Sequence, residues 1–270
     1  MINGISVILK ETPNYAMDEL EHYYANERDA TEYQYKIIAF TVGLYLVFFA
    51  FALDYIHLWL MIPISSILVT RWLIAFHELL HLKKADDLDW LTRLVPIPFS
   101  PINLGYREYR QIHMGHHRYT AQQEDPDAFH IRGGHLKALL GAITHHEQAS
   151  YRFVKRYGLS TELTAMFTLR AALFVALLLV FGKTFLAWFL VLRITYIIND
   201  YIFFHLVHYR AGEFGTFKIL LPTWLQYLFI VMYGVDVVYA TMHHDMHHHN
   251  VRIAAKYLPR IAAEQAVSRC

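Results

Sequence analysis

Long apolar stretches are the feature of this sequence that most limits its fold. Residues 37–53, 56–73, 163–181 and 185–204 are each largely apolar, and a helix needs roughly 20 such residues to cross a bilayer. The whole chain is 56% hydrophobic and only 17% charged, whereas a soluble domain averages about 45–50% and about 25%. The sequence therefore predicts an all-α integral membrane protein with four transmembrane helices.

The connections between these stretches predict how the four helices are arranged. Only a few residues, around Asp54 and around Gly182, separate the members of each pair. Each pair should form a hairpin whose tip is too short to hold a domain, so both termini and the long polar segments share one side of the membrane. Basic residues mark the cytoplasmic side, and five lie near helix ends on this side: Arg152, Lys155, Arg156, Arg210 and Lys218. We therefore expect a cytoplasmic helical cap.

The segments outside the four apolar stretches complete this organisation. We expect residues 1–35 to form a polar, partly helical arm and residues 1–270 to form a single membrane domain. Residues 88–102 are amphipathic and interrupted by proline, which is typical of a segment lying on the membrane surface. Residues 217–240 are apolar but broken by Pro222 and Asp236, so we expect them to be interfacial and not to span the membrane.

Charge and cysteine content exclude several classes of function. The net charge of +1 gives no reason to expect a nucleic-acid partner. The only cysteine is Cys270, which excludes an intramolecular disulfide, a four-cysteine zinc site, a fused rubredoxin and a cysteine-ligated iron–sulfur cluster. Any metal in this protein must therefore be held by nitrogen or oxygen.

Three clusters of histidine predict a metal centre. Segment 77–81 reads H-E-L-L-H, segment 113–117 reads H-M-G-H-H, and segment 244–248 reads H-D-M-H-H. Histidines three or four residues apart lie on one face of a helix, so their imidazoles can reach one site. Eight imidazoles exceed what one tetrahedral metal takes, which favours two metals sharing these ligands: His77, His81, His113, His116, His117, His244, His247 and His248.

The order and context of these boxes resemble the membrane fatty acid desaturase and hydroxylase superfamily. The resemblance covers residues 37–259 and includes the segment 106–110 before the second box, Asp125-Pro126-Asp127 after it, and Tyr257-Leu258-Pro259 near the end. It implies a di-iron centre on the cytoplasmic face, O2 as the oxidant and an acyl or alkyl substrate tunnel between the transmembrane helices. It also implies a ninth ligand at the end of the fourth helix, and His205 and His208 are the candidates. Tyr209 after His208 resembles the His-Tyr of alkane monooxygenases and favours His208.

We expect other polar residues in supporting or incidental positions. Glu78, Asp245, Asn199 and Asp200 are candidates to orient the metal ligands, and we expect no catalytic residue beyond the ligands themselves. Arg193 lies seven residues before Asp200, so the two can pair on one helix face. Four further histidines are expected in an exposed loop: His130, His135, His145 and His146.

The expected activity is an O2-dependent oxidoreductase that acts on an acyl or lipid chain, most simply a fatty acid desaturase. Hydroxylation of an alkane or lipid remains the alternative within the same superfamily. The sequence lacks a fused electron-transfer module, so a ferredoxin, a rubredoxin or cytochrome b5 should supply the electrons. H-E-x-x-H is also the signature of zinc proteases, but a protease would leave the histidines of the second and third boxes without a role. A metal transporter or storage protein would need polar residues along several of the apolar helices.

Overall fold

The computed structural model describes residues 17–82, 99–120 and 122–267, and most of these residues are helical, which confirms the expected helical class. The first half contains η1 (Met17–Tyr23), α1 (Glu27–Ala52), α2 (Leu58–His81), α4 (Tyr106–Tyr119), α5 (Ala128–Ile131), α6 (His135–Ile143) and α7 (His145–Tyr157). The second half contains α8 (Thr161–Asp200), η2 (Tyr201–Leu206), β1 (Tyr209–Arg210), β2 (Glu213–Phe214), α9 (Thr223–Tyr233), α10 (Val235–Met242), α11 (His244–His249), η3 (Ala255–Tyr257) and α12 (Leu258–Val267).

Three helices in the described ranges are long and apolar enough to cross a membrane. They are Glu27–Ala52, Leu58–His81 and Thr161–Leu206, the last of which combines α8 with the π-helix η2. This third helix has 46 residues, and at 1.5 Å per residue it would be roughly 69 Å long if straight. That length is more than twice the roughly 30 Å hydrocarbon core of a bilayer.

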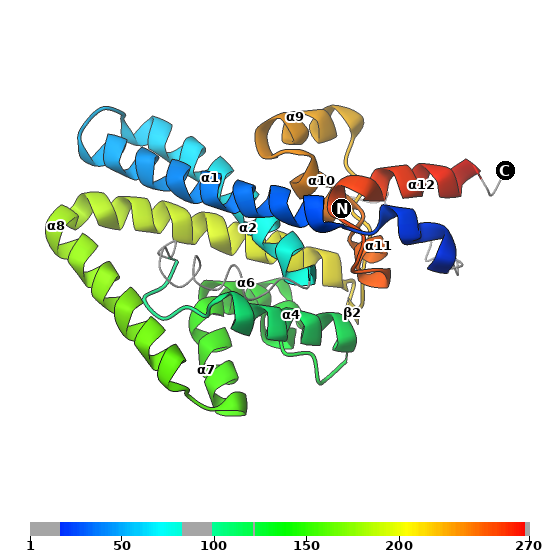
Figure 1. The fold of residues 1–270 in the computed structure, drawn as a ribbon, viewed down its shortest axis with the longest axis horizontal. Helices are drawn as coiled ribbons and strands as arrows, with labels where there is room; N and C mark the ends of the chain where they lie inside the picture. The colour runs from blue at the N-terminus through cyan, green and yellow to red at the C-terminus, as the bar shows by residue number, and fades with distance from the viewer. Residues whose placement is uncertain (1–16, 83–98, 121, 268–270) are drawn as a thin grey trace.

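The α8 helix is not straight, because its backbone leaves the helical conformation at Gly182. That residue has φ 51° and ψ −124°, a combination that glycine adopts far more readily than other residues. The rings of Phe174 and Phe189 lie only 5.0 Å apart across this point, although fifteen residues of straight helix would separate them by about 22 Å. Figure 1 shows the two arms of α8 meeting in a sharp bend. The chain therefore reverses direction where the sequence separates residues 163–181 from 185–204.

α1 begins at Glu27, well before its apolar stretch, because Asn26 accepts hydrogen bonds from the backbone N–H groups of Arg28 and Asp29 and caps the helix.

The long apolar helices α1, α2 and α8 share one core. Phe48 of α1 stacks on Trp188 of α8 with ring centroids 4.7 Å apart. Trp72 and Leu79 of α2 belong to the same buried core as Phe48 and Trp188, which fixes the end of α2 that carries the first histidine box.

The structure describes one of the expected surface segments in full and only part of the others. Residues 217–240 do not form a spanning helix: they contain the 11-residue α9 and most of the 8-residue α10, separated by Gly234 with φ 91°. Much of the expected surface segment 88–102, and residues 1–16 of the expected N-terminal arm, lie outside the described residues.

Candidate metal centre

The first histidine box lies at the end of α2. His77 and His81 are one helical turn apart, with ring centroids separated by 4.9 Å. The α4 helix packs on this end of α2, and the Tyr106 hydroxyl donates a hydrogen bond to the backbone carbonyl of Leu79. This contact places the second box beside the first.

The three histidines of the second box point in two different directions. His113 and His117, four residues apart on α4, face the first box: His113 Nε2 lies 3.1 Å from His81 Nε2 and 3.1 Å from His117 Nε2. His116 lies between them in sequence and points elsewhere, with its Nε2 3.1 Å from His208 Nε2. A single helix therefore supplies ligands to two neighbouring sites.

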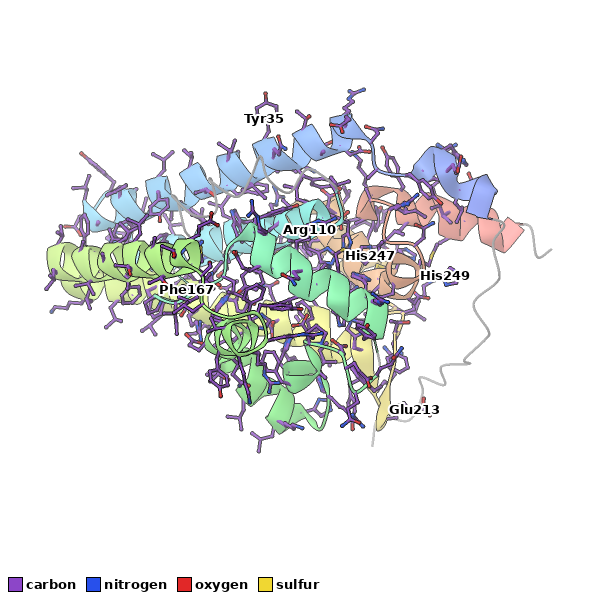
Figure 2. All side chains as sticks on the ribbon, turned by 60° about the horizontal axis from the view of Figure 1, so that its bottom comes forward. Tyr35, Arg110, Phe167, Glu213, His247 and His249 are labelled. Carbon is purple, nitrogen blue, oxygen red and sulfur yellow. The ribbon has the colours of Figure 1, made fainter. Side chains whose placement is uncertain are left out.

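The structure gathers the histidines into two clusters, which we call cluster A and cluster B. Figure 2 labels His247 inside the molecule and His249, two residues later, at its outer edge. Cluster A has five members, whose ligand nitrogens lie within 4.8 Å of one another: His77, His81, His113, His117 and His247. Cluster B has three members that meet the same limit, His116, His208 and His248, and His244 joins them because its Nε2 lies 2.9 Å from His208 Nε2.

The two candidates for the ninth ligand, His205 and His208, lie in different surroundings. His208 lies in cluster B, and its Nδ1 donates to the carbonyl of Gly215 at 2.9 Å, which leaves Nε2 directed into the cluster. His205 lies outside both clusters: its Nδ1 is 2.8 Å from the carbonyl of Ile131 and its Nε2 is 3.1 Å from His135 Nδ1. Residues 201–206 form a π-helix that ends between the two histidines, so His205 and His208 do not share the face that they would share in a continuous α-helix.

Buried hydrogen-bond partners orient several of the cluster histidines. Glu78 is 3% exposed; one carboxylate oxygen lies 3.2 Å from His77 Nδ1 and the other accepts from the backbone N–H of Ala255 at 2.8 Å. Asp125 accepts from His116 Nδ1 at 2.9 and 3.0 Å. Such bonds fix which ring nitrogen remains free for a metal.

Asn199 and Asp200, two other candidates for orienting the ligands, contact residues outside clusters A and B. Asn199 donates to the Thr70 hydroxyl at 2.9 Å and the Thr195 carbonyl at 2.8 Å, and so ties α8 to α2. Asp200 contacts His130 and His145, not a histidine of cluster A or B. Asp245 Oδ1 is buried without a hydrogen-bond partner among the described residues.

Burial keeps the cluster histidines in the form that binds metal. Among the cluster histidines outside the spanning helices, burial lowers the pKa well below the ordinary value for six, and neighbouring imidazoles add to the effect: His113, His117, His208, His244, His247 and His248. These imidazoles are neutral near pH 7 and keep a lone pair available for coordination. In the described part of the chain, both ring nitrogens of His247 and the Nε2 atom of His248 are buried without hydrogen-bond partners, as expected for a site completed by metal.

A cavity of about 120 Å³ adjoins both clusters. His77 and His113 of cluster A and His116 and His244 of cluster B line one part of it. Most of the remaining wall is apolar or aromatic and includes Trp72, Phe76, Leu80, Ile112, Phe203 and Phe204. An apolar ligand in this cavity would therefore lie against the histidines.

The structure corrects two expectations about residues outside the boxes. His130, His145 and His146 are 1%, 4% and 2% exposed, so these three lie in the interior and not in an exposed loop, because α5 and α7 pack against the end of α8. Arg193 does not pair with Asp200: it binds Glu147 at 2.7 Å and the backbone carbonyls of Phe99 and Ile143.

The chain matches a family of known proteins. A family model described as fatty acid desaturase matches residues 56–267, a range that contains all three histidine boxes and His208. No curated protein and no solved structure matches the chain.

Proposed function

Because the chain belongs to the fatty acid desaturase family, we propose that it is a membrane-bound, non-heme di-iron oxidoreductase that uses O2 to desaturate an acyl or lipid chain. The observation that carries this proposal is the pair of adjoining clusters, five histidines in A and four in B. All nine ligands are imidazoles, a donor type that suits iron. The cavity that reaches both clusters supports an apolar substrate.

The protein would contribute positioning and the exclusion of water. Bound iron would supply the oxidising power of O2 for removing hydrogen from an unactivated C–H bond. Cluster A would hold one iron through His77, His81, His113, His117 and His247, and cluster B the other through His116, His208, His244 and His248. Glu78 and Asp125 would hold His77 and His116 in place, while Phe76, Phe203 and Phe204 would line the path of the chain.

Three features of the wider assembly belong to the same proposal. The bend at Gly182 supports four membrane crossings arranged as two hairpins, with a helical cap that carries the histidines and both termini on the cytoplasmic face. Residues 1–270 would form one domain, and a ferredoxin, rubredoxin or cytochrome b5 would dock on the cap. Single-cysteine variants test the topology after Cys270 is replaced: a cysteine at Lys183 should react only from the side opposite to a cysteine restored at position 270. Labelling of both from one side would contradict the four-crossing arrangement.

The zinc-protease alternative is less compatible with this geometry. A protease glutamate must face a metal-bound water, but both oxygens of Glu78 are engaged by His77 and by the backbone of Ala255. Hydroxylation within the same superfamily remains the second candidate, because the cavity and the clusters serve both reactions equally.

Lipid profiling tests the proposed activity. Cells that express the protein should accumulate lipids with an additional double bond, in an O2-dependent manner. His208→Ala should abolish this product, whereas His205→Ala should retain it, because only His208 lies in a cluster. A product with an added hydroxyl group would establish the hydroxylase alternative. Activity that survives His208→Ala would contradict the ligand assignment.

A further inference from the structure

A third group of potential metal ligands lies outside clusters A and B. His130 of α5, His145 of α7 and Asp200 at the end of α8 are each less than 5% exposed, and their ligand atoms lie within 4.8 Å of one another. The Phe204 ring stands between this group and cluster B, with its centroid 4.9 Å from the His130 ring and 6.0 Å from the His116 ring. Side chains from three separate elements thus converge on a point outside clusters A and B.

The distances within this group suit a single ion. The two Nδ1 atoms are 3.4 Å apart, and two nitrogens at about 2.1 Å from a tetrahedral metal stand roughly 3.4 Å apart. The Asp200 carboxylate presents one oxygen to each ring: Oδ2 is 2.9 Å from His130 Nδ1 and Oδ1 is 3.0 Å from His145 Nδ1.

Unsatisfied atoms provide a second, independent observation. Although Asp200 Oδ1 is close to His145 Nδ1, the geometry is not that of a hydrogen bond, and this oxygen has no hydrogen-bond partner among the described residues. His130 Nε2 is also buried without such a partner. Leaving a buried polar atom unpaired destabilises the fold, and a cation between the three side chains would give the carboxylate oxygen a partner.

We infer that His130, His145 and Asp200 form a mononuclear site for a divalent transition metal, distinct from the two clusters. Two imidazoles and one carboxylate are the ligand set of open zinc sites and of mononuclear non-heme iron sites, which keep coordination positions for a further ligand. His145 and Asp200 both line the cavity, so an open position would face it. The further ligand would be an oxygen of a hydroxyl or carbonyl group on a molecule in the cavity. This inference stands on its own geometry and does not depend on the proposed oxidation.

The competing arrangement contains no metal. Asp200 on one side and Asp127, whose Oδ1 lies 3.6 Å from His130 Nε2, on the other would hold a protonated His130 in a buried ion-pair network. The two arrangements predict different metal contents, so metal binding decides between them.

Cobalt titration of metal-stripped, detergent-solubilised protein provides the first test. We expect the wild-type chain to bind three Co²⁺ ions and His145→Gln to bind two, with the remaining two ions showing that the variant is folded. His57→Gln removes an exposed histidine at the start of α2 and should still bind three. A wild-type chain that binds only two ions, or a His145→Gln variant that still binds three, would overturn the inference.

A cysteine substitution gives a positive spectroscopic signal that does not depend on counting. Nδ1 is the ring nitrogen nearer the backbone, so the thiolate of His145→Cys can reach nearly the same point. With Cys270 replaced, Co²⁺-loaded His145→Cys should show a near-ultraviolet thiolate-to-cobalt absorption band that His135→Cys, at an exposed position, lacks. Absence of the band in His145→Cys while two cobalt ions are bound would overturn the third site and leave the proposed di-iron function standing. Fewer than two ions in the wild type would instead contradict the di-iron function.

Discussion

Replacing Glu78 with glutamine changes the orientation of a metal ligand while preserving the shape of the side chain. The glutamine carbonyl can still accept from the N–H of Ala255, which Glu78 binds at 2.8 Å. Its NH2 group would then face His77 Nδ1, which now lies 3.2 Å from a carboxylate oxygen. Two N–H donors cannot bond to each other, so His77 must either lose its partner or move the proton to Nε2, the nitrogen that faces cluster A.

The expected loss of metal affinity follows from breaking the contact between Glu78 and His77. Removing the partner of a metal-bound histidine lowers metal affinity about 10–100-fold, which corresponds to roughly 1.4–2.8 kcal/mol. A buried N–H left unpaired costs a similar amount, about 1–3 kcal/mol. In Glu78→Gln we therefore expect cluster A to bind its metal about 10–100-fold more weakly than in the wild type. Cluster B should keep its wild-type affinity.

Competition with a chromophoric chelator measures these affinities site by site. Glu213→Gln is the matched control, because Glu213 is exposed on β2 at the periphery of the molecule (Figure 2). Equal affinities in Glu78→Gln and the wild type would refute the argument that Glu78 positions His77. A parallel loss from both clusters would show that the substitution acts by unfolding the protein.

Further predictions concern cluster B, the bend in α8 and the metals themselves. Asp125→Asn should lower the affinity of cluster B about 10–100-fold, measured by the same competition, because both Asp125 oxygens accept from His116; loss from cluster A instead would contradict the assignment. Gly182→Ala should destabilise the protein by about 1–3 kcal/mol in thermal unfolding, because its φ is +51°, whereas Gly134→Ala, at φ −68° and with open space around the added methyl group, should be close to neutral. Equal effects of the two glycine substitutions would contradict the role of the bend. Chelation of the metals should lower the unfolding temperature, since a ligand at 1,000 times its Kd stabilises the native state by about 4 kcal/mol, and an unchanged temperature would argue against metals within the core.

The sequence predicts the helical scaffold and much of the metal centre because both depend on local spacing. Apolar runs of membrane length indicate the helices, and Gly182 marks the point at which α8 bends. Intervals of three and four residues on a helix place imidazoles on one face, and the structure gathers all eight box histidines into clusters A and B.

The remaining features depend on contacts that spacing does not report. His205 and His208 share a face only in an α-helix, and the π-helix over residues 201–206 separates them. The seven-residue spacing allows Asp200 to pair with Arg193, but α5 and α7 bring His130 and His145 to it. Asp125 is recognised as part of the metal centre only when the loop after α4 folds back onto His116; the Asp125-Pro126-Asp127 motif was the signal for it.

The location of iron tests the central claim most directly. An anomalous difference map collected at the iron absorption edge from crystals of the purified protein should show one peak inside cluster A and one inside cluster B. Each peak should be surrounded by the histidines named above, and His208 should lie beside the second. A single peak shared by all nine histidines, or zinc in place of iron at both positions, would contradict the di-iron account.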